Sequence, residues 1–178
     1  MAEPAVKELE SLDRRIKTQW RSFELRPAPS PTLDPDGDYL VSAWRNHVYP
    51  LAAKMQMNLK RPSVQPRSRL AHESAKWADR QNRFGEYNLA LFRAFLEHGK
   101  NIGDIEILKG LAFDLQLDAE SLSASLKSGE FTAMVLADEH EAGQVGVRAV
   151  PAFVVDGKLL AAGGQTGKRL HELLAAET

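Results

Sequence analysis

The 178-residue sequence contains no cysteine. This absence excludes disulfide bonds, thiolate nucleophiles, redox-active dithiols and cysteine-ligated zinc sites within these residues. An excess of charge is also missing, because 23 basic and 24 acidic side chains leave a formal net charge of -1. Without a net positive field there is no electrostatic reason to expect a nucleic acid or an anionic membrane as a partner.

Long apolar runs are missing as well. No segment approaches the roughly 20 residues that a transmembrane helix needs, and the N-terminal residues lack a basic stretch followed by an apolar one. We therefore expect a cytoplasmic protein. The sequence also lacks G-x-S-x-G and H-E-x-x-H motifs, so it gives no motif-level indication of a serine hydrolase or a zinc peptidase.

The residues that are present have the balance of a soluble globular domain. Apolar residues make up 43% of the chain and charged residues 26%, far from a disordered composition. The length predicts one compact unit with room for an inserted subdomain.

Apolar residues recur at steps of three and four in much of the chain, which predicts amphipathic helices. The first is expected from Pro4 to Ile16, and Asp104 and Asp118 are expected to cap the starts of two later helices. The remaining helical stretches are Leu40 to Val48, Ser68 to Ala78, Tyr87 to Phe95, Ile105 to Leu115, Leu122 to Leu126, and one that contains Met134 and Val135.

Extended structure is expected in three places. Residues 18–25 are predicted to form a short strand that ends before Pro27. The apolar run 152–155 and the stretch 158–162 flank Asp156-Gly157, a strong turn signal, and predict a β-hairpin. A terminal helix capped by Thr166 follows. The order helix, strand, several helices, hairpin, helix predicts a layered α/β fold with a helical insertion.

Four motifs along the chain resemble the DsbA-like thioredoxin-fold family, in its FrnE-like and 2-hydroxychromene-2-carboxylate isomerase branch. WRSFELRP is similar to that branch's W-x-P-F-E-L-x-P strand, although Ser22 replaces the usual proline. The most specific motif is the last one, a proline-led hairpin followed by a glycine pair. The motifs are WRSFELRP (20–27), LAHE (70–73), ALFRAF with NIGD (90–95 and 101–104), and VRAVPAFVVDG with GGQ (147–157 and 163–165).

The resemblance implies a thioredoxin-like α/β fold. Its thioredoxin-like domain would comprise residues 1–37 and 145–178, and the helical insertion residues 38–144. It also implies that Pro151 follows a cis peptide bond and that Ala149, Val150 and Pro151 form a substrate-contact loop. A trans proline that begins an edge strand is the alternative.

The sequence departs from the family at its start. Family members begin with a central strand that leads to a Cys-x-x-Cys, or to a serine in the isomerase branch, at the first helix. Here the first strand is expected to be missing, because the chain begins within that helix. Either the true start lies upstream, or the two flanking strands close the gap, or a second chain supplies the missing surface. We therefore expect a homo-oligomer.

The inherited activity would be thiol-disulfide oxidoreduction, which residues without cysteine cannot perform. Whether the chain is an enzyme is therefore left open, and no catalytic residue is assigned. One alternative is a glutathione-dependent isomerase or transferase relative, with glutathione as its possible cofactor. The other is a non-catalytic scaffold that holds an extended peptide or a small thiol compound at the loop of Val150 and Pro151.

Three further patterns are interpreted without assigning a site to them. GGQTGK (163–168) departs from the phosphate-loop pattern, so helix capping is favoured over anion binding. DEHE (138–141) is interpreted as a solvated helix face, because consecutive helical residues cannot converge on one metal ion. His72 is interpreted as a packing or hydrogen-bonding position.

Overall fold

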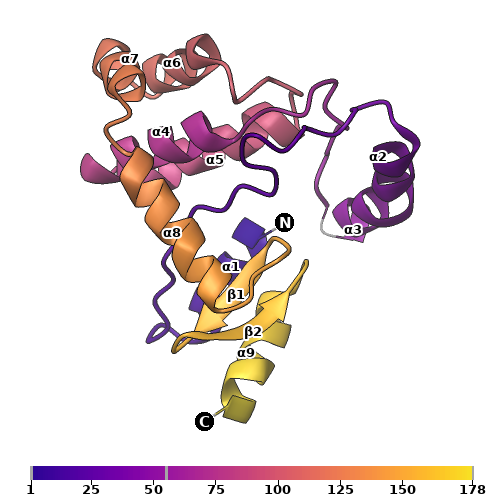
Figure 1. Cartoon of the computed structure of the whole chain (residues 1–178). Coiled ribbons are helices and arrows are strands. Elements are labelled where there is room, and N and C mark those ends of the chain that lie inside the picture. Colours follow the sequence, from indigo (N-terminus) through magenta and orange to yellow (C-terminus); the bar gives the residue numbers. More distant parts are fainter. Residues whose placement is uncertain (1, 55, 178) are drawn as a thin grey trace. The chain divides into compact units, whose positions relative to one another are not determined.

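The structure is a computed structural model that describes residues 2–54 and 56–177. The chain divides into two compact units. Unit 1 joins the N-terminal part, up to Leu25, to the C-terminal part from Ala137 onward, and unit 2 comprises Arg26–Leu136. The second boundary falls within α8, Thr132–Gln144 (Figure 1).

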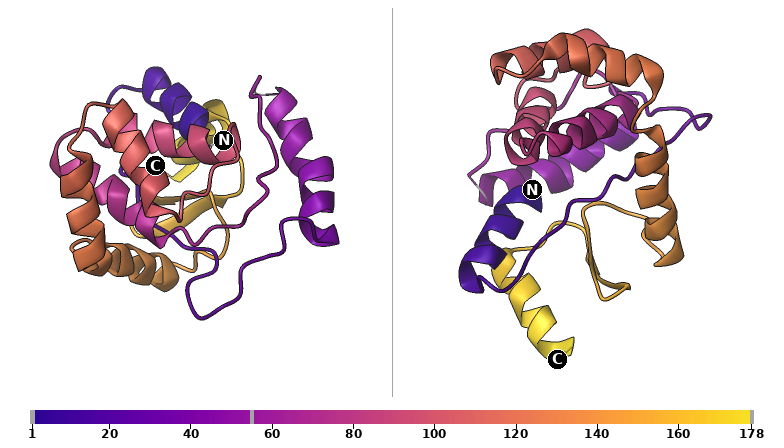
Figure 2. Two further views of the ribbon diagram at one scale, coloured as in Figure 1. Left: turned by 90° about the horizontal axis from the view of Figure 1, so that it is seen from above. Right: turned by 90° about the vertical axis from the view of Figure 1, so that its left-hand side faces the viewer.

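Unit 1 is built on two helices and a hairpin. Helices α1 (Ala2–Leu12) and α9 (Gly167–Glu177) pack against each other, and strands β1 (Ala152–Val155) and β2 (Lys158–Ala162) form the hairpin (Figures 1 and 2). Leu9 and Leu170 from the predicted apolar stripes, together with Ala5, fill the core between them. The buried members are Ala5, Leu9 and Leu170, with Ile16, Phe153, Ala161 and Leu174 packed around them.

The predicted hairpin is confirmed in position. β1 and β2 are antiparallel, with Ala152 opposite Ala162 and Val155 opposite Lys158. Asp156 and Gly157 both have positive φ, 48° and 73°, as the tight two-residue turns of hairpins require. A register shift between Phe153 and Val154 marks a β-bulge.

The predicted strand over residues 18–25 is wrong. The segment has no regular secondary structure, although it lies in the same unit as the hairpin. The N–H of Ser22 donates to Oδ2 of Asp138 at 2.8 Å, and the N–H of Glu24 donates to Oε1 of Glu139 at 3.2 Å. Carboxylates on α8 thus take backbone hydrogen bonds that a neighbouring strand would otherwise accept.

Unit 2 is helical, as expected. Its core is formed mainly by α4, α5, α6 and α7, where Trp77 and Tyr87 meet edge to face with ring centroids 6.3 Å apart. The phenolic O–H of Tyr87 donates to the carbonyl of Leu108 at 2.9 Å, so this fully buried side chain keeps a polar partner. The four helices span Arg69–Arg80, Phe84–Leu96, Ile105–Asp114 and Ala119–Ser128.

The predicted helix caps are confirmed. Asp104 accepts the N–H of Glu106 at the start of α6, and Asp118 accepts two N–H groups at the start of α7. Gly129 ends α7 in the left-handed conformation, with φ of 67°.

The first helical stretch of unit 2 is not a regular α-helix. α2 (Asp38–Ala43) continues into a π-helical segment, η1 (Trp44–Val48), and then into α3 (Tyr49–Lys54). Pro50 directly follows the π-helical segment within this continuous helical stretch, and it has no backbone N–H to donate. The π-helical segment was not predicted, because side-chain periodicity carries no signal for a single widened turn.

Candidate functional site

The loop Ala149–Pro151 lies immediately before β1, and the Val150–Pro151 peptide bond is cis, as the resemblance implied. The carbonyl of Pro151 accepts the N–H of Gly163 at 2.8 Å, which fixes the end of the loop to the hairpin. The side chain of Val150 is 43% exposed. In the described part of the chain, the backbone N–H and C=O of Val150 make no hydrogen bond.

One edge of β1 continues this loop. Just before β1, the carbonyl of Pro151 accepts the N–H of Gly163, and at the other end of the strand Val155 pairs with Lys158. Backbone groups at both ends of β1 therefore point toward β2. Because successive strand residues bond toward opposite edges, the N–H and C=O of Ala152 and Val154 point away from β2. Among the described residues the sheet has only these two strands, so that edge has no strand beside it.

Segment 17–25, which has no regular secondary structure, carries a second set of backbone groups in the same unit. Ser22 and Glu24 donate their N–H groups to side chains of α8, and the neighbouring residues Arg21 and Phe23 carry further backbone N–H and C=O groups. Within the described ranges these groups of Arg21 and Phe23 make no hydrogen bond.

A charged network fixes this segment to α8. Asp138 is only 3% exposed, and its Oδ1 accepts Nη1 of Arg21 at 2.8 Å while its Oδ2 accepts the N–H of Ser22. Arg21 also reaches Glu141, at 3.4 Å. The expectation of a solvated face is therefore wrong for Asp138, because a distant segment covers that side of the helix. No group of three or more histidine, aspartate or glutamate side chains within residues 2–54 and 56–177 could hold a metal ion.

The glycine-rich stretch before α9 is a capping site. The N–H of Gly167 donates to Oε2 of Glu8 at 2.6 Å, and the N–H of Arg169 donates to Oγ1 of Thr166 at 3.1 Å. Thr166 therefore caps the helix as predicted. A carboxylate of the chain itself already occupies the positive end of the helix, where an anion would bind.

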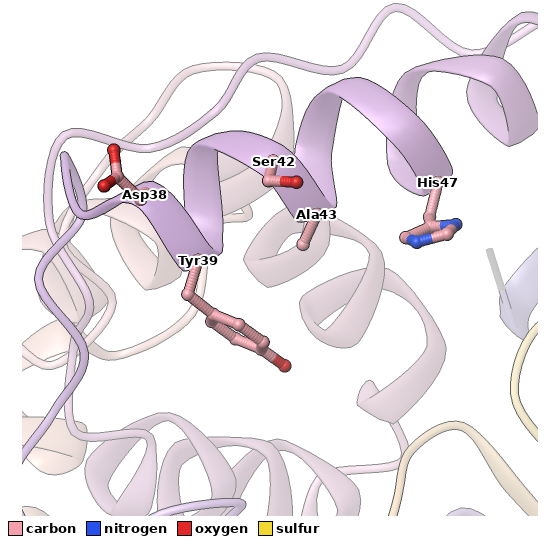
Figure 3. A pocket seen from close by; sticks show the side chains of 5 residues that line it. All are labelled: Asp38, Tyr39, Ser42, Ala43 and His47. Carbon is pink, nitrogen blue, oxygen red and sulfur yellow. The ribbon is translucent and has the colours of Figure 1, made fainter.

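Unit 2 carries an open pocket of about 490 Å³ that was not predicted. Its lining side chains come from a single helical stretch, and Figure 3 shows Tyr39, Ala43 and His47 along the same side of it. The four-residue spacing of these three residues was a visible signal, but on a helix it does not distinguish a cavity wall from a solvated face. The lining residues are Asp38, Tyr39, Ser42, Ala43 and His47.

The fold is that of the thioredoxin-like DsbA proteins, mostly helical with a small two-stranded sheet and an inserted helical region. The sequence matches the DSBA-like thioredoxin domain over residues 1–175, and the chain therefore belongs to this family. The resemblance drawn from the four sequence motifs is confirmed at this level.

Known proteins agree with this assignment. The chain is 34% identical over 161 residues to the uncharacterized protein YwbO of Bacillus subtilis, a match that covers 88% of this chain and 80% of YwbO. Its fold is similar to that of the probable DsbA oxidoreductase SCO1869 of Streptomyces coelicolor, with a TM-score of 0.76 and 23% identity over 98% of this chain and 82% of that one. A proposed protein disulfide isomerase from Nitrosomonas europaea has a TM-score of 0.71, with 17% identity over 97% and 87% of the two chains.

Among the described residues, no helix combines the length and the apolar character that crossing a membrane requires.

Proposed function

We propose that this member of the DsbA-like family binds an extended polypeptide at Ala149–Pro151 and along the adjoining edge of β1. The observation that carries the proposal is the set of free backbone groups on Val150, Ala152 and Val154. An extended peptide can add to such an edge as a further strand, gaining main-chain hydrogen bonds with little dependence on its sequence. Binding through these backbone groups requires no cysteine, and the sequence contains none.

The side chains around this edge favour an apolar partner. The side chains of Val150 and Val154 are 43% and 44% exposed, and these residues also carry free backbone groups. No charged residue lies between Arg148 and Asp156, so the edge lacks the lysines that commonly protect exposed strands from pairing. WRSFELRP and the hairpin motif resemble the FrnE-like branch, which supports assigning the chain to that branch of the family.

A proline substitution at the edge tests the proposal. In Val154→Pro the lost N–H is the one that points away from β2, so the hairpin keeps its own hydrogen bonds. We expect this variant to bind a fluorescein-labelled peptide of five valines between lysine pairs at least about tenfold more weakly than the unchanged chain, as measured by fluorescence anisotropy.

Leu159→Pro is the matched control. Leu159 faces Val154 across the hairpin, and its N–H points to the outer edge of β2. We expect this variant to bind like the unchanged chain, with both variants checked by circular dichroism. Equal binding by Val154→Pro and the unchanged chain, or no binding by the unchanged chain, would overturn the proposal.

A second copy of the chain is the competing occupant of the same edge. Sedimentation velocity of the unchanged chain and of Val154→Pro separates the two cases. An oligomer that dissociates only in Val154→Pro, and that excludes the peptide, would assign the edge to self-association and overturn peptide binding as its role.

A further inference from the structure

The open pocket of unit 2 gathers polar groups that the chain itself leaves unused. Its volume of about 490 Å³ lies within the range of roughly 300–1,000 Å³ that small-molecule sites have. The carboxylate of Asp38, the phenol of Tyr39 and the imidazole of His47 all border it. Among the residues that the structure describes, these three side chains form no hydrogen bond, ion pair or ring contact with one another or with any other side chain.

The π-helical segment aligns the two aromatic side chains of this pocket. In an uninterrupted α-helix, side chains eight residues apart are rotated by about 80° from each other. A π-helical turn takes more residues than an α-helical one, so η1 reduces the rotation between Tyr39 and His47. Both rings and Ala43 lie along one side of the stretch (Figure 3). The small Ala43 is thus a floor between two rings that are separated by about 12 Å of helix rise.

The helical stretch that carries this row is fixed on both sides. Trp44 is buried in a hydrophobic cluster of unit 2, and its ring meets that of Tyr49 edge to face, with centroids 5.4 Å apart. Ahead of the stretch, Arg61 holds the preceding turn through an ion pair with Asp36 at 3.0 Å. A wall that is already ordered binds a ligand at a lower cost in conformational entropy.

We propose that this pocket binds a flat aromatic cation of one or two rings. The ring system would lie on Ala43 between Tyr39 and His47, with its positively charged group at Asp38. Aromatic faces attract cations and stack against other rings, and the carboxylate supplies the complementary charge. The hydroxyl of Ser42, whose Oγ accepts Nδ2 of Asn46 at 3.1 Å, adds a polar contact one turn along from the carboxylate.

The charge at Asp38 makes the pocket selective. Although Asp38 is the first residue of α2, the start of this helix has no side-chain capping hydrogen bond, so the carboxylate is not used there. Among the described lining residues there is no lysine or arginine that would neutralise it. An aromatic anion would therefore meet an uncompensated negative charge, whereas a cation of the same shape would be attracted.

Two indoles of opposite charge test the proposal. Tryptamine and indole-3-propionate have the same two fused rings, with an ammonium group on one side chain and a carboxylate on the other. Each is titrated into the ¹⁵N-labelled full chain and followed by NMR. We expect tryptamine to shift the amide signals of residues 38–47 and to bind at least about fivefold more tightly than indole-3-propionate.

Tyr39→Ala and Asp38→Asn should each weaken tryptamine binding at least about fivefold. Two substitutions on α6 are the matched controls and should bind like the unchanged chain. Phe113→Ala removes a ring that is 75% exposed, much as that of Tyr39 is at 70%, and Asp114→Asn makes the same change of charge as Asp38→Asn.

Absence of tryptamine binding, shifts confined to residues outside 38–47, equal binding of the two indoles, or unchanged binding by Tyr39→Ala would each overturn this site. The pocket belongs to unit 2 and the edge of β1 to unit 1, so none of these results bears on peptide binding at β1.

Discussion

Gly167, the first residue of α9, donates its backbone N–H to the carboxylate of Glu8 in the middle of α1. The two residues are 159 positions apart in the sequence, and their contact joins the two helices of unit 1. A Cβ at position 167 would lie 2.5 Å from the backbone N of Leu9 and 2.6 Å from the carbonyl O of Ala5. The glycine is therefore required by close packing of two helix backbones.

We predict that Gly167→Ala destabilises the protein, because backbone atoms cannot move aside as a flexible side chain can. The expected loss in the free energy of unfolding is about 1–3 kcal/mol, measured by urea denaturation. Gly110→Ala is the control: this glycine lies within α6 with no atom within 4 Å of the added Cβ. It should gain roughly 0.5–1 kcal/mol, since alanine is the better helix former. Equal effects of the two substitutions would contradict the packing argument.

The buried carboxylate of Asp138 provides a second test. Replacing it with alanine leaves the N–H of Ser22 without its acceptor and Arg21 without its closer partner. We expect Asp138→Ala to lower the free energy of unfolding by about 1–3 kcal/mol, as removal of the partner of a buried donor does. The comparison is Glu141→Ala, which removes only the exposed ion pair with Arg21 and should cost less than about 1 kcal/mol. A loss from Glu141→Ala as large as that from Asp138→Ala would contradict this assignment.

The features that the sequence predicted are those set by neighbouring residues. The hairpin is defined by Asp156-Gly157 and the apolar runs on either side, and the caps at Asp104 and Asp118 involve residues two or three positions away. The cis bond before Pro151 was expected from the family resemblance, whose motif is contiguous. Local chemistry is enough for each of these features.

The features that the sequence did not predict depend on distant partners. Residues 18–25 have strand-like composition, but a strand needs a neighbour, and their backbone bonds to α8 instead. Asp138 looked solvated because the segment that covers it lies 116 residues earlier. The free edge of β1 was expected only from the family resemblance, through the missing first strand, because alternation shows which face of a strand is buried and not which strands flank it.

Asp13 allows a test based on titration. Hydrogen bonds from the Arg15 side chain and backbone N–H, together with its positive charge, lower the pKa of Asp13 from 3.8 to about 2. A lowered pKa in the folded state means that this carboxylate favours folding above pH 3.8 and that its contribution is lost as the pH falls toward 2. We expect an NMR titration of the carboxyl carbon to give a midpoint near 2.

Arg15→Ala should raise that midpoint toward 3.8, whereas Arg14→Ala, one residue earlier, should leave it unchanged. A midpoint that does not move in Arg15→Ala would show that Arg15 is not the cause.

Tyr87 makes the corresponding prediction for high pH. Burial raises the pKa of Tyr87 from 10.0 to about 12, because the phenolate would lose its hydration in the core of unit 2. In the unfolded chain the phenol loses its proton near pH 10, so the unfolded state binds fewer protons between pH 10 and 12. The contribution of Tyr87 to stability is therefore fully present below pH 10 and declines as the pH rises toward 12.

The absorbance change of tyrosinate should include one component with a midpoint near 12, and this component should be missing in Tyr87→Phe. That variant also loses the hydrogen bond to the carbonyl of Leu108, for an expected loss of about 0.5–1.5 kcal/mol in the free energy of unfolding at neutral pH. The decline in stability between pH 10 and 12 should be smaller in Tyr87→Phe, because phenylalanine has no proton to lose. An equal decline in both proteins would mean that alkaline unfolding is governed by another group.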